Sequence, residues 1–256
     1  MVGKKLKNMK KIYTTLFFII GLLLVSCDNE DTANVSQVTY FPIVTLEGNN
    51  PEVVKPLGTA YADPGVTATE NGAPIPFTTT AFGKYRGTTI LDTKVMDEYT
   101  QAYTAINKDG FSSTAERKVI VYQNGNLTTS IEGLYTSTVK RNGSYMSASQ
   151  GSSVDMKYVY IWKNGNGTFQ ISDAFGGWYN LGRNIPNSFT PGGLFSASFV
   201  PTGNAITNPY FGGSAVIKSL TVNAATKTLV MTTDWVAPGT PPTNYTFECT
   251  LVQTTL

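Results

Sequence analysis

A run of eleven residues in the second half of the chain carries the side chains that sugar recognition needs. Two glycines precede Trp178 and Tyr179, so the backbone bends freely there, which allows a ring on a loop or strand edge to face solvent. Flat aromatic faces cover the apolar faces of pyranose rings, and Asp173, Asn180 and Arg183 supply polar partners for the hydroxyl groups. The run predicts a sugar site. Packing of Trp178 in a core is the simpler explanation, because tryptophan is highly buried on average.

Two further tryptophans belong to the predicted ligand-binding set. Trp162 shares one face of a predicted strand with Tyr158 and Tyr160. Trp235 stands at a strand end before a loop rich in proline and glycine. The row ending at Trp162 either lines a cleft or packs in a core, and core packing is the simpler explanation, since both faces of that strand are apolar.

The residue types exclude several kinds of catalysis. Histidine is absent, which removes Ser-His-Asp and Cys-His chemistry and the usual zinc ligand sets. A glycoside hydrolase needs two carboxyl groups, about 5–5.5 Å apart for retention or about 6.5–9.5 Å apart for inversion. The second half offers five carboxylates outside any recognisable motif: Glu132, Asp155, Asp173, Asp234 and Glu248. We predict no catalysis, cofactor or metal, with a carboxylate-based glycoside hydrolase as an alternative.

The N-terminus has the pattern of a secretory signal peptide. Five lysines precede an apolar run over residues 12–25. A helix of that length spans about 21 Å, whereas a bilayer core is about 30 Å thick. A positive head, a short apolar core and small residues before a break predict a signal peptide over residues 1–26.

The residues that follow indicate where the protein is attached. Leu24-Val25-Ser26-Cys27 resembles the lipobox of bacterial lipoproteins, which implies that Cys27 carries a lipid and anchors the protein to a membrane. A signal peptide with a chance cysteine is the alternative. The acidic segment Asp28-Asn29-Glu30-Asp31, in a predicted tether over residues 27–37, resembles the surface-export signal of Bacteroidetes lipoproteins. That resemblance implies the cell surface of the outer membrane, whereas in enterobacteria an Asp after the cysteine implies inner-membrane retention.

Composition favours an all-β protein with little affinity for nucleic acid. Without residues 1–26 the chain has 14 basic and 17 acidic residues, so it lacks the basic surface that nucleic acids require. Segments rich in Thr, Val, Tyr and Phe alternate with turn residues and show no sustained helical period. Cys249 lies in one such segment, which predicts a buried structural thiol.

A motif in the first half resembles a known domain. The pattern Tyr-x-Asp-Pro-Gly-Val-x-Ala over residues 61–68, together with Tyr99, residues 103–105 and the Asp-Gly turn at 109–110, resembles the bacterial Ig-like domains of the HYR and crystal-toxin-associated type. The likeness covers residues 40–122. It implies a seven-stranded β-sandwich over residues 38–122 that serves as a spacer or adhesion module, without catalytic residues.

Residues 130–256 are predicted to form an antiparallel meander, closed as a β-barrel or folded as a sandwich. The strands are expected at residues 132–140, 155–163, 167–173, 194–200, 214–223, 226–235 and 243–253. The aromatic segments and closing hairpin resemble C-terminal domains of uncharacterised Bacteroides surface lipoproteins, often found beside polysaccharide-import systems. The resemblance hints at a glycan, a polysaccharide or oligosaccharide, as the ligand and at importer proteins as partners. A structural or adhesion lipoprotein that binds a protein is the alternative.

Overall fold

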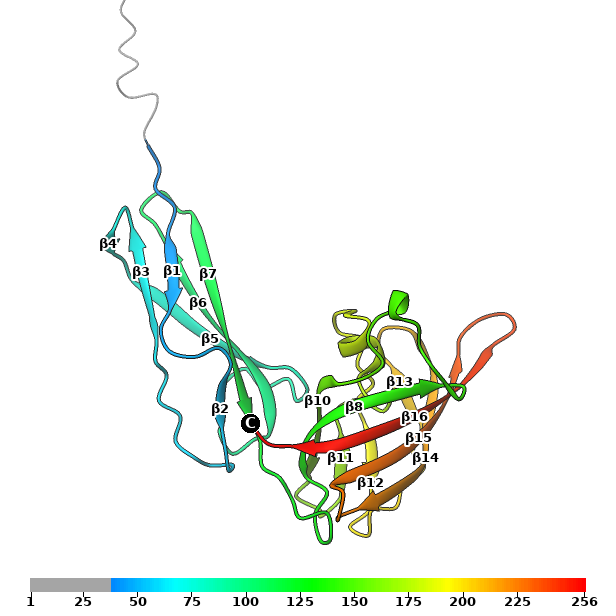
Figure 1. Ribbon diagram of the computed structural model, residues 1–256. Helices are drawn as coiled ribbons and strands as arrows, with labels where there is room; N and C mark the ends of the chain where they lie inside the picture. Colours follow the sequence, from blue (N-terminus) through cyan, green and yellow to red (C-terminus); the bar gives the residue numbers. More distant parts are fainter. Residues whose placement is uncertain (1–37) are drawn as a thin grey trace, which may run out of the picture. The chain divides into compact units, whose positions relative to one another are not determined.

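Strands make up nearly all the regular structure of the computed structural model, which describes residues 38–256 (Figure 1). The predicted signal peptide and the tether, with Cys27, lie outside the described residues. An Ig-like sandwich comes first in the chain and a large antiparallel sheet follows. The prediction of an all-β chain with an Ig-like N-terminal domain is confirmed.

The Ig-like domain consists of two sheets. In the first, β3 lies between β1 and β4, and in the second the order is β2-β7-β6-β5. Neighbouring strands are antiparallel except β2 and β7, which run parallel. The strands are β1 (Ile43–Leu46), β2 (Glu52–Val54), β3 (Val66–Glu70), β4 (Ala73–Pro74), β5 (Phe77–Gly83), β6 (Asp97–Ile106) and β7 (Ser112–Val121).

The central hairpin, β6 and β7, carries the core of this domain. Its side chains alternate between the inside and the outside of the sandwich, as a strand buried on one face requires. Tyr99, Tyr103 and Val119 are fully buried. The predicted Asp-Gly turn closes the hairpin: Gly110 has a φ of +87°, and Asn107 Oδ1 accepts the Phe111 N–H at 2.7 Å. A left-handed glycine suits such a turn because it lacks a Cβ.

An ion pair with a buried arginine holds the motif over residues 61–68 in place. Arg117 is completely buried, and its Nη1 lies 2.9 Å from Asp63 Oδ1. Its Nη2 donates to the carbonyl groups of Glu47 and Gly65. Because a buried guanidinium needs a partner, Asp63 fastens the segment that carries the motif to β7.

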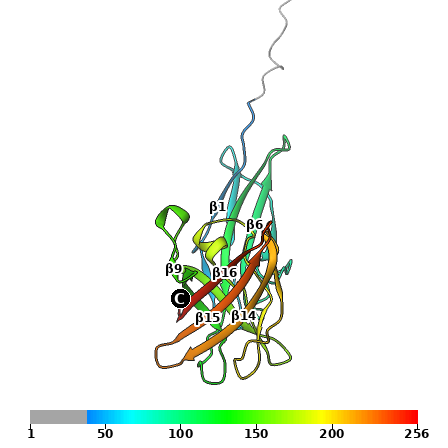
Figure 2. The same ribbon diagram turned by 90° about the vertical axis from the view of Figure 1, so that its right-hand side faces the viewer.

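The C-terminal domain is a nine-stranded antiparallel sheet that is nearly closed like a barrel. The order is β12-β11-β10-β8-β16-β15-β14-β13, and β9 pairs with β8. Figure 2 shows β14, β15 and β16 side by side. The strands are β8 (Gly133–Arg141), β9 (Ser144–Tyr145), β10 (Met156–Lys163), β11 (Phe169–Ile171), β12 (Gly193–Phe195), β13 (Ile206–Asn208), β14 (Gly212–Asn223), β15 (Thr228–Ala237) and β16 (Thr243–Thr254).

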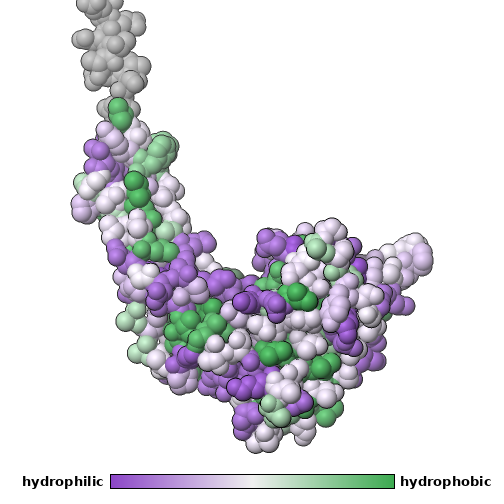
Figure 3. Space-filling model, in the orientation of Figure 1, coloured by the Kyte–Doolittle hydropathy of each residue, from purple (hydrophilic) through white to green (hydrophobic). Residues whose placement is uncertain are grey.

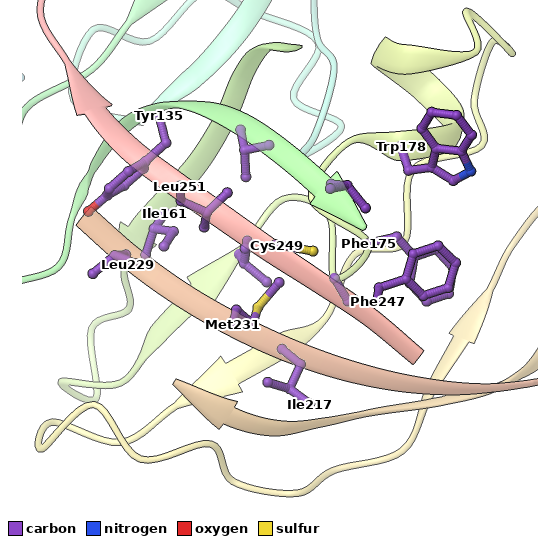
Figure 4. Packing of buried hydrophobic residues seen from close by; sticks show 14 of the residues in the cluster. Tyr135, Ile161, Phe175, Trp178, Ile217, Leu229, Met231, Phe247, Cys249 and Leu251 are labelled. Carbon is purple, nitrogen blue, oxygen red and sulfur yellow. The ribbon is translucent and has the colours of Figure 1, made fainter. Parts of the chain in front are cut away.

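The concave side of this sheet encloses a hydrophobic core (Figure 4). Met231, Cys249 and Leu251 point into it from β15 and β16 and are fully buried. Cys249 is a free thiol, and burial raises its pKa well above the ordinary value. The prediction of a buried structural thiol at Cys249 is confirmed.

Candidate functional site

The predicted sugar site lies largely in the core. Trp178 and Tyr179, in a π-helical turn at Trp178–Gly182, have exposed fractions of 1% and 4%. Of the two explanations for this run, an exposed ring and packing in the core, the structure supports core packing. Gly176 and Gly177 have φ of +62° and +84°, and a Cβ at Gly176 would lie 2.8 Å from Cys249 Sγ. The two glycines therefore carry the chain closely past the sheet, and the rings pack under it.

Trp235 belongs to the same interior cluster of aromatic rings, so the prediction that it frames an exposed site is also wrong. Its ring centroid lies 5.3 Å from that of Phe175 and 6.0 Å from that of Tyr179. Its Nε1 donates to the carbonyl of Gly212 at 3.1 Å. Since that donor is satisfied inside the protein, the tryptophan fills the core without an unpaired polar atom.

Asp173 is buried as well, where no sugar hydroxyl reaches it in this conformation. Its Oδ1 accepts the Phe175 N–H at 2.8 Å, while Oδ2 has no hydrogen-bond partner. Burial raises the pKa of this carboxyl to about 7, although the Phe175 N–H opposes the shift. The prediction of Asp173 as a direct ligand contact is therefore wrong for this structure.

Trp162 packs against the Ig-like domain instead of lining an open cleft. Tyr160, Trp162 and Leu134 form a hydrophobic cluster with residues of the first domain, including Met96, Ile120 and Tyr122. The guanidinium of Arg86 lies 5.3 Å from the Trp162 ring. Of the two explanations for the row that ends at Trp162, core packing is the one that the structure supports.

The remaining two predicted residues lie at the surface. Asn180 is half-buried, and its Nδ2 donates to the carbonyl of Ile185 at 3.2 Å. Arg183 is exposed, with its guanidinium 6.0 Å from the Tyr179 ring. Only Asn180 of the predicted set lines the cleft described next.

A cleft of about 660 Å³ lies within the compact unit Phe41–Leu256, where the Ig-like domain meets the C-terminal domain. We call it the interdomain cleft. Pockets of about 300–1,000 Å³ are typical of small-molecule sites. Residues of β5 and β6 line one wall, and residues 152–157 and 180–187 line the other.

The wall formed by the Ig-like domain offers an aromatic ring beside charged groups. Phe82, on β5, is 53% exposed. Lys84 Nζ lies 3.1 Å from Glu98 Oε1, and Lys118 Nζ lies 3.2 Å from the same oxygen. The Glu98 carboxylate is therefore neutralised by two cations, which leaves Phe82 as the main apolar face in this wall.

The wall formed by the C-terminal domain carries polar side chains beside the apolar Met156, Leu181 and Pro186. Asp155, Lys157, Asn184 and Asn187 are exposed along it, and Asn180 lies beside them. Asn184 and Asn187 have φ of +53° and +58°, a conformation that asparagine tolerates better than most residues. Backbone hydrogen bonds from Arg183 and Ile185 to Trp178 and Tyr179 fix this loop on the buried turn.

The arrangement suits hydrogen bonding to a polar ligand. Asparagine amides both donate and accept, lysine ammonium groups donate, and carboxylates accept. Within residues 38–256, no group of three or more His, Cys, Asp or Glu side chains is placed to hold a metal. In the same part of the chain, no helix has the length and apolar character needed to cross a membrane.

Sequence reasoning missed most of this cleft because its walls, residues 82–100 and residues 152–187, lie more than 50 residues apart in the chain. One local signal was available. Phe82 follows three threonines and Ala81 in β5, a strand without charged residues. A large aromatic residue in a threonine-rich strand, two residues before Lys84, is the sequence pattern that points to a surface role for Phe82.

Comparisons with known proteins cover both domains. A family model described as "Bacterial surface protein, Ig-like domain" matches residues 44–121, and the model of a C-terminal domain family matches residues 124–253. None of the curated proteins matches the chain. The lipoprotein BT2262 from Bacteroides thetaiotaomicron has a similar structure, with 25% sequence identity and a TM-score of 0.52, covering 83% of this chain and 100% of that one. Since the C-terminal domain model spans half of the 256 residues, the chain belongs to that family, and it carries this domain behind a bacterial surface Ig-like domain.

Proposed function

We propose that this chain is a lipoprotein of the outer cell surface that binds a glycan without catalysis, and that the interdomain cleft holds the sugar. The cleft itself carries the proposal, because it combines an exposed ring, Phe82, with asparagine amides and charged side chains in a volume of about 660 Å³. A pyranose presents an apolar face and a rim of hydroxyl groups, which these two walls complement.

Two observations support attachment at the cell surface. The similar structure from Bacteroides is that of a lipoprotein, and the Ig-like model describes bacterial surface proteins. The lipobox ending at Cys27 supplies the attachment point in this chain. A lipid anchor holds the cleft near the membrane, which raises the local concentration of captured glycan beside importer proteins.

Affinity electrophoresis through gels that contain single polysaccharides tests the proposal. We expect at least one neutral polysaccharide to retard the native protein. Phe82→Ala is expected to weaken binding roughly threefold to tenfold, because an aromatic contact contributes about 0.5–1.5 kcal/mol. Asn184→Ala is expected to weaken it too, while Phe111→Ala, an exposed Phe outside the cleft lining, serves as the matched control.

The same gels separate the other functions. Release of reducing sugar by the native protein contradicts a non-catalytic role. A protein partner is favoured by one specific feature: among residues 38–256, β5 is the last strand of its sheet and pairs with β6 alone, so an extended peptide has an edge to add to. Failure of every polysaccharide to retard the protein, together with capture of extended peptides that Phe82→Ala reduces, favours that alternative.

A further inference from the structure

Large apolar side chains gather at one end of the Ig-like domain without a cover among the described residues. We call this end the apolar tip. Two of its members, Phe41 and Ile43, have exposed fractions of 62% and 63%. The tip consists of Phe41, Ile43, Phe77, Ile106 and Phe111. Single exposed apolar residues are common, but a contiguous group marks an interaction surface.

Backbone pairing brings these side chains together. Ile106 ends β6 and Phe111 precedes β7, with the turn at residues 107–110 between them. The ring of Phe111 contacts that of Phe41 in an edge-to-face arrangement at 5.0 Å. Phe77 and Ile106 line a small groove of about 190 Å³. The start of β1 and the turn between β6 and β7 lie at the same end of the domain (Figure 1), and hydrophobic residues reach the surface over β1 (Figure 3).

The charges around the tip do not make it a site for anions. Lys108 is the cation of the turn, and its Nζ lies 4.0 Å from Asp109 Oδ1. Its backbone N–H faces Glu70 Oε2 at 3.5 Å. Since acidic groups balance the cation, the tip suits an apolar or interfacial surface rather than a polyanion.

The sequence places a lipid within reach of this end. Thirteen residues separate Cys27 from Phe41. A chain of that length spans at most about 50 Å even when fully extended. If Cys27 is acylated, as the proposed function requires, the chain that leaves the lipid anchor reaches the Ig-like domain at its apolar tip, beginning with Phe41.

We propose that the apolar tip contacts the lipid bilayer that holds the acyl anchor, with Phe41 and Phe111 in the headgroup region. Aromatic side chains are favoured at that depth, and a second attachment strengthens a single lipid anchor. This inference rests on the proposed acylation of Cys27 but is independent of glycan binding. β7 then leads from the tip to Val121, where the C-terminal domain follows.

Fluorescence quenching in vesicles tests this contact. The full-length acylated protein carrying Phe111→Cys is labelled with an environment-sensitive dye and reconstituted in phosphatidylethanolamine–phosphatidylglycerol vesicles with doxyl-labelled lipid. Cys249 is fully buried, so labelling is confined to the new thiol. Tyr145→Cys, at an exposed position in the C-terminal domain, is the matched control. We expect at least twofold stronger quenching at position 111 than at position 145, and little change in 0.5 M NaCl because the contact is apolar.

Three outcomes overturn the proposal. Equal quenching at the two positions means that the tip does not touch lipid. A blue-shifted dye at position 111 that doxyl lipids leave unquenched means that a second copy or another protein covers the tip. Mass spectrometry that finds no acyl group on Cys27 overturns both this contact and the proposed anchoring, whereas loss of glycan retardation alone leaves the contact standing.

Discussion

Two carboxyl groups, Asp63 and Asp173, show how differently this protein uses the same side chain. Asp63 Oδ1 accepts hydrogen bonds from the Tyr103 hydroxyl at 2.6 Å and from Arg117 Nη1 at 2.9 Å. Its Oδ2 accepts one from Gln101 Nε2 at 2.8 Å. Asp173 has one bonded oxygen and one without a partner. The first carboxyl stabilises its domain as an anion, whereas the second is favoured in the protonated form.

Replacing Asp63 is expected to destabilise the Ig-like domain. In Asp63→Asn the charge that pairs with the buried Arg117 is lost. The amide NH₂ group also replaces one of the two carboxylate oxygens that accept hydrogen bonds from Arg117 and Gln101. Removing one partner of a buried ion pair costs about 3 kcal/mol, the low end of the usual range, since Asp63 is 31% exposed. Urea unfolding measures the loss. The control Glu248→Gln breaks a solvent-exposed pair with Lys140, and an equal loss there contradicts the assignment.

Asp173 is expected to make stability depend on pH. Its pKa is about 7 in the folded state and 3.8 in the reference state, so between these values the folded protein binds a proton that the unfolded chain has released. Stability therefore falls as pH rises from about 4 to about 7, by at most about 4 kcal/mol. Urea unfolding at a series of pH values checks this. Asp173→Asn is expected to remove that slope, and parallel curves for the two proteins would falsify the assignment.

At the scale of elements, the turn over residues 176–182 decides what the aromatic residues do. Two glycines in the left-handed region let the chain pass beneath the sheet, and the following π-helical turn buries Trp178. The ring of Phe175 stacks on that of Phe247 at 4.5 Å, which fixes the turn against β16. The loop at residues 180–187 rests on this turn, so the core holds this wall of the interdomain cleft in place.

Trp178→Ala is expected to act on folding first. Deleting a fully buried tryptophan costs about 4 kcal/mol, because a cavity remains. The midpoint of urea unfolding gives the measurement. Tyr210→Ala, which truncates a residue that is 58% exposed, should change stability by no more than about 0.5 kcal/mol. A Trp178→Ala protein of native stability would contradict the burial of this ring.

The sequence predicted strands well and side-chain exposure poorly. Expected strands at 155–163 and 243–253 compare with β10 at Met156–Lys163 and β16 at Thr243–Thr254, because alternation with a period of two is a local property. The expected strand at 194–200 stops at Phe195, where a turn with Phe199 in the left-handed region follows. The pair Gly176-Gly177 is compatible with an exposed loop as well as with a buried turn, and the sequence does not show that the backbone there passes close to the sheet.

At the scale of the whole molecule, the interdomain cleft could not be predicted because neither domain contains it alone. Phe82 and Lys84 come from the Ig-like domain, whereas Asn180 and Asn184 come from the loop on the buried turn. The sequence signals for all-β structure and for the Ig-like motif are local. The two walls of the cleft, in contrast, face each other because Tyr160 and Trp162 pack in a cluster with residues of the first domain. Two ordinary β domains thereby create a cleft that carries both polar and apolar side chains.

Hydrogen–deuterium exchange with and without the most strongly retarding oligosaccharide is the most direct measurement of ligand binding in the interdomain cleft. Bound sugar is expected to slow amide exchange at residues 82–84 and 180–187 together, because both walls contact it. Slowing confined to another surface, such as the loop at residues 209–213, or no slowing at all while the sugar is bound, would contradict a binding site in the cleft.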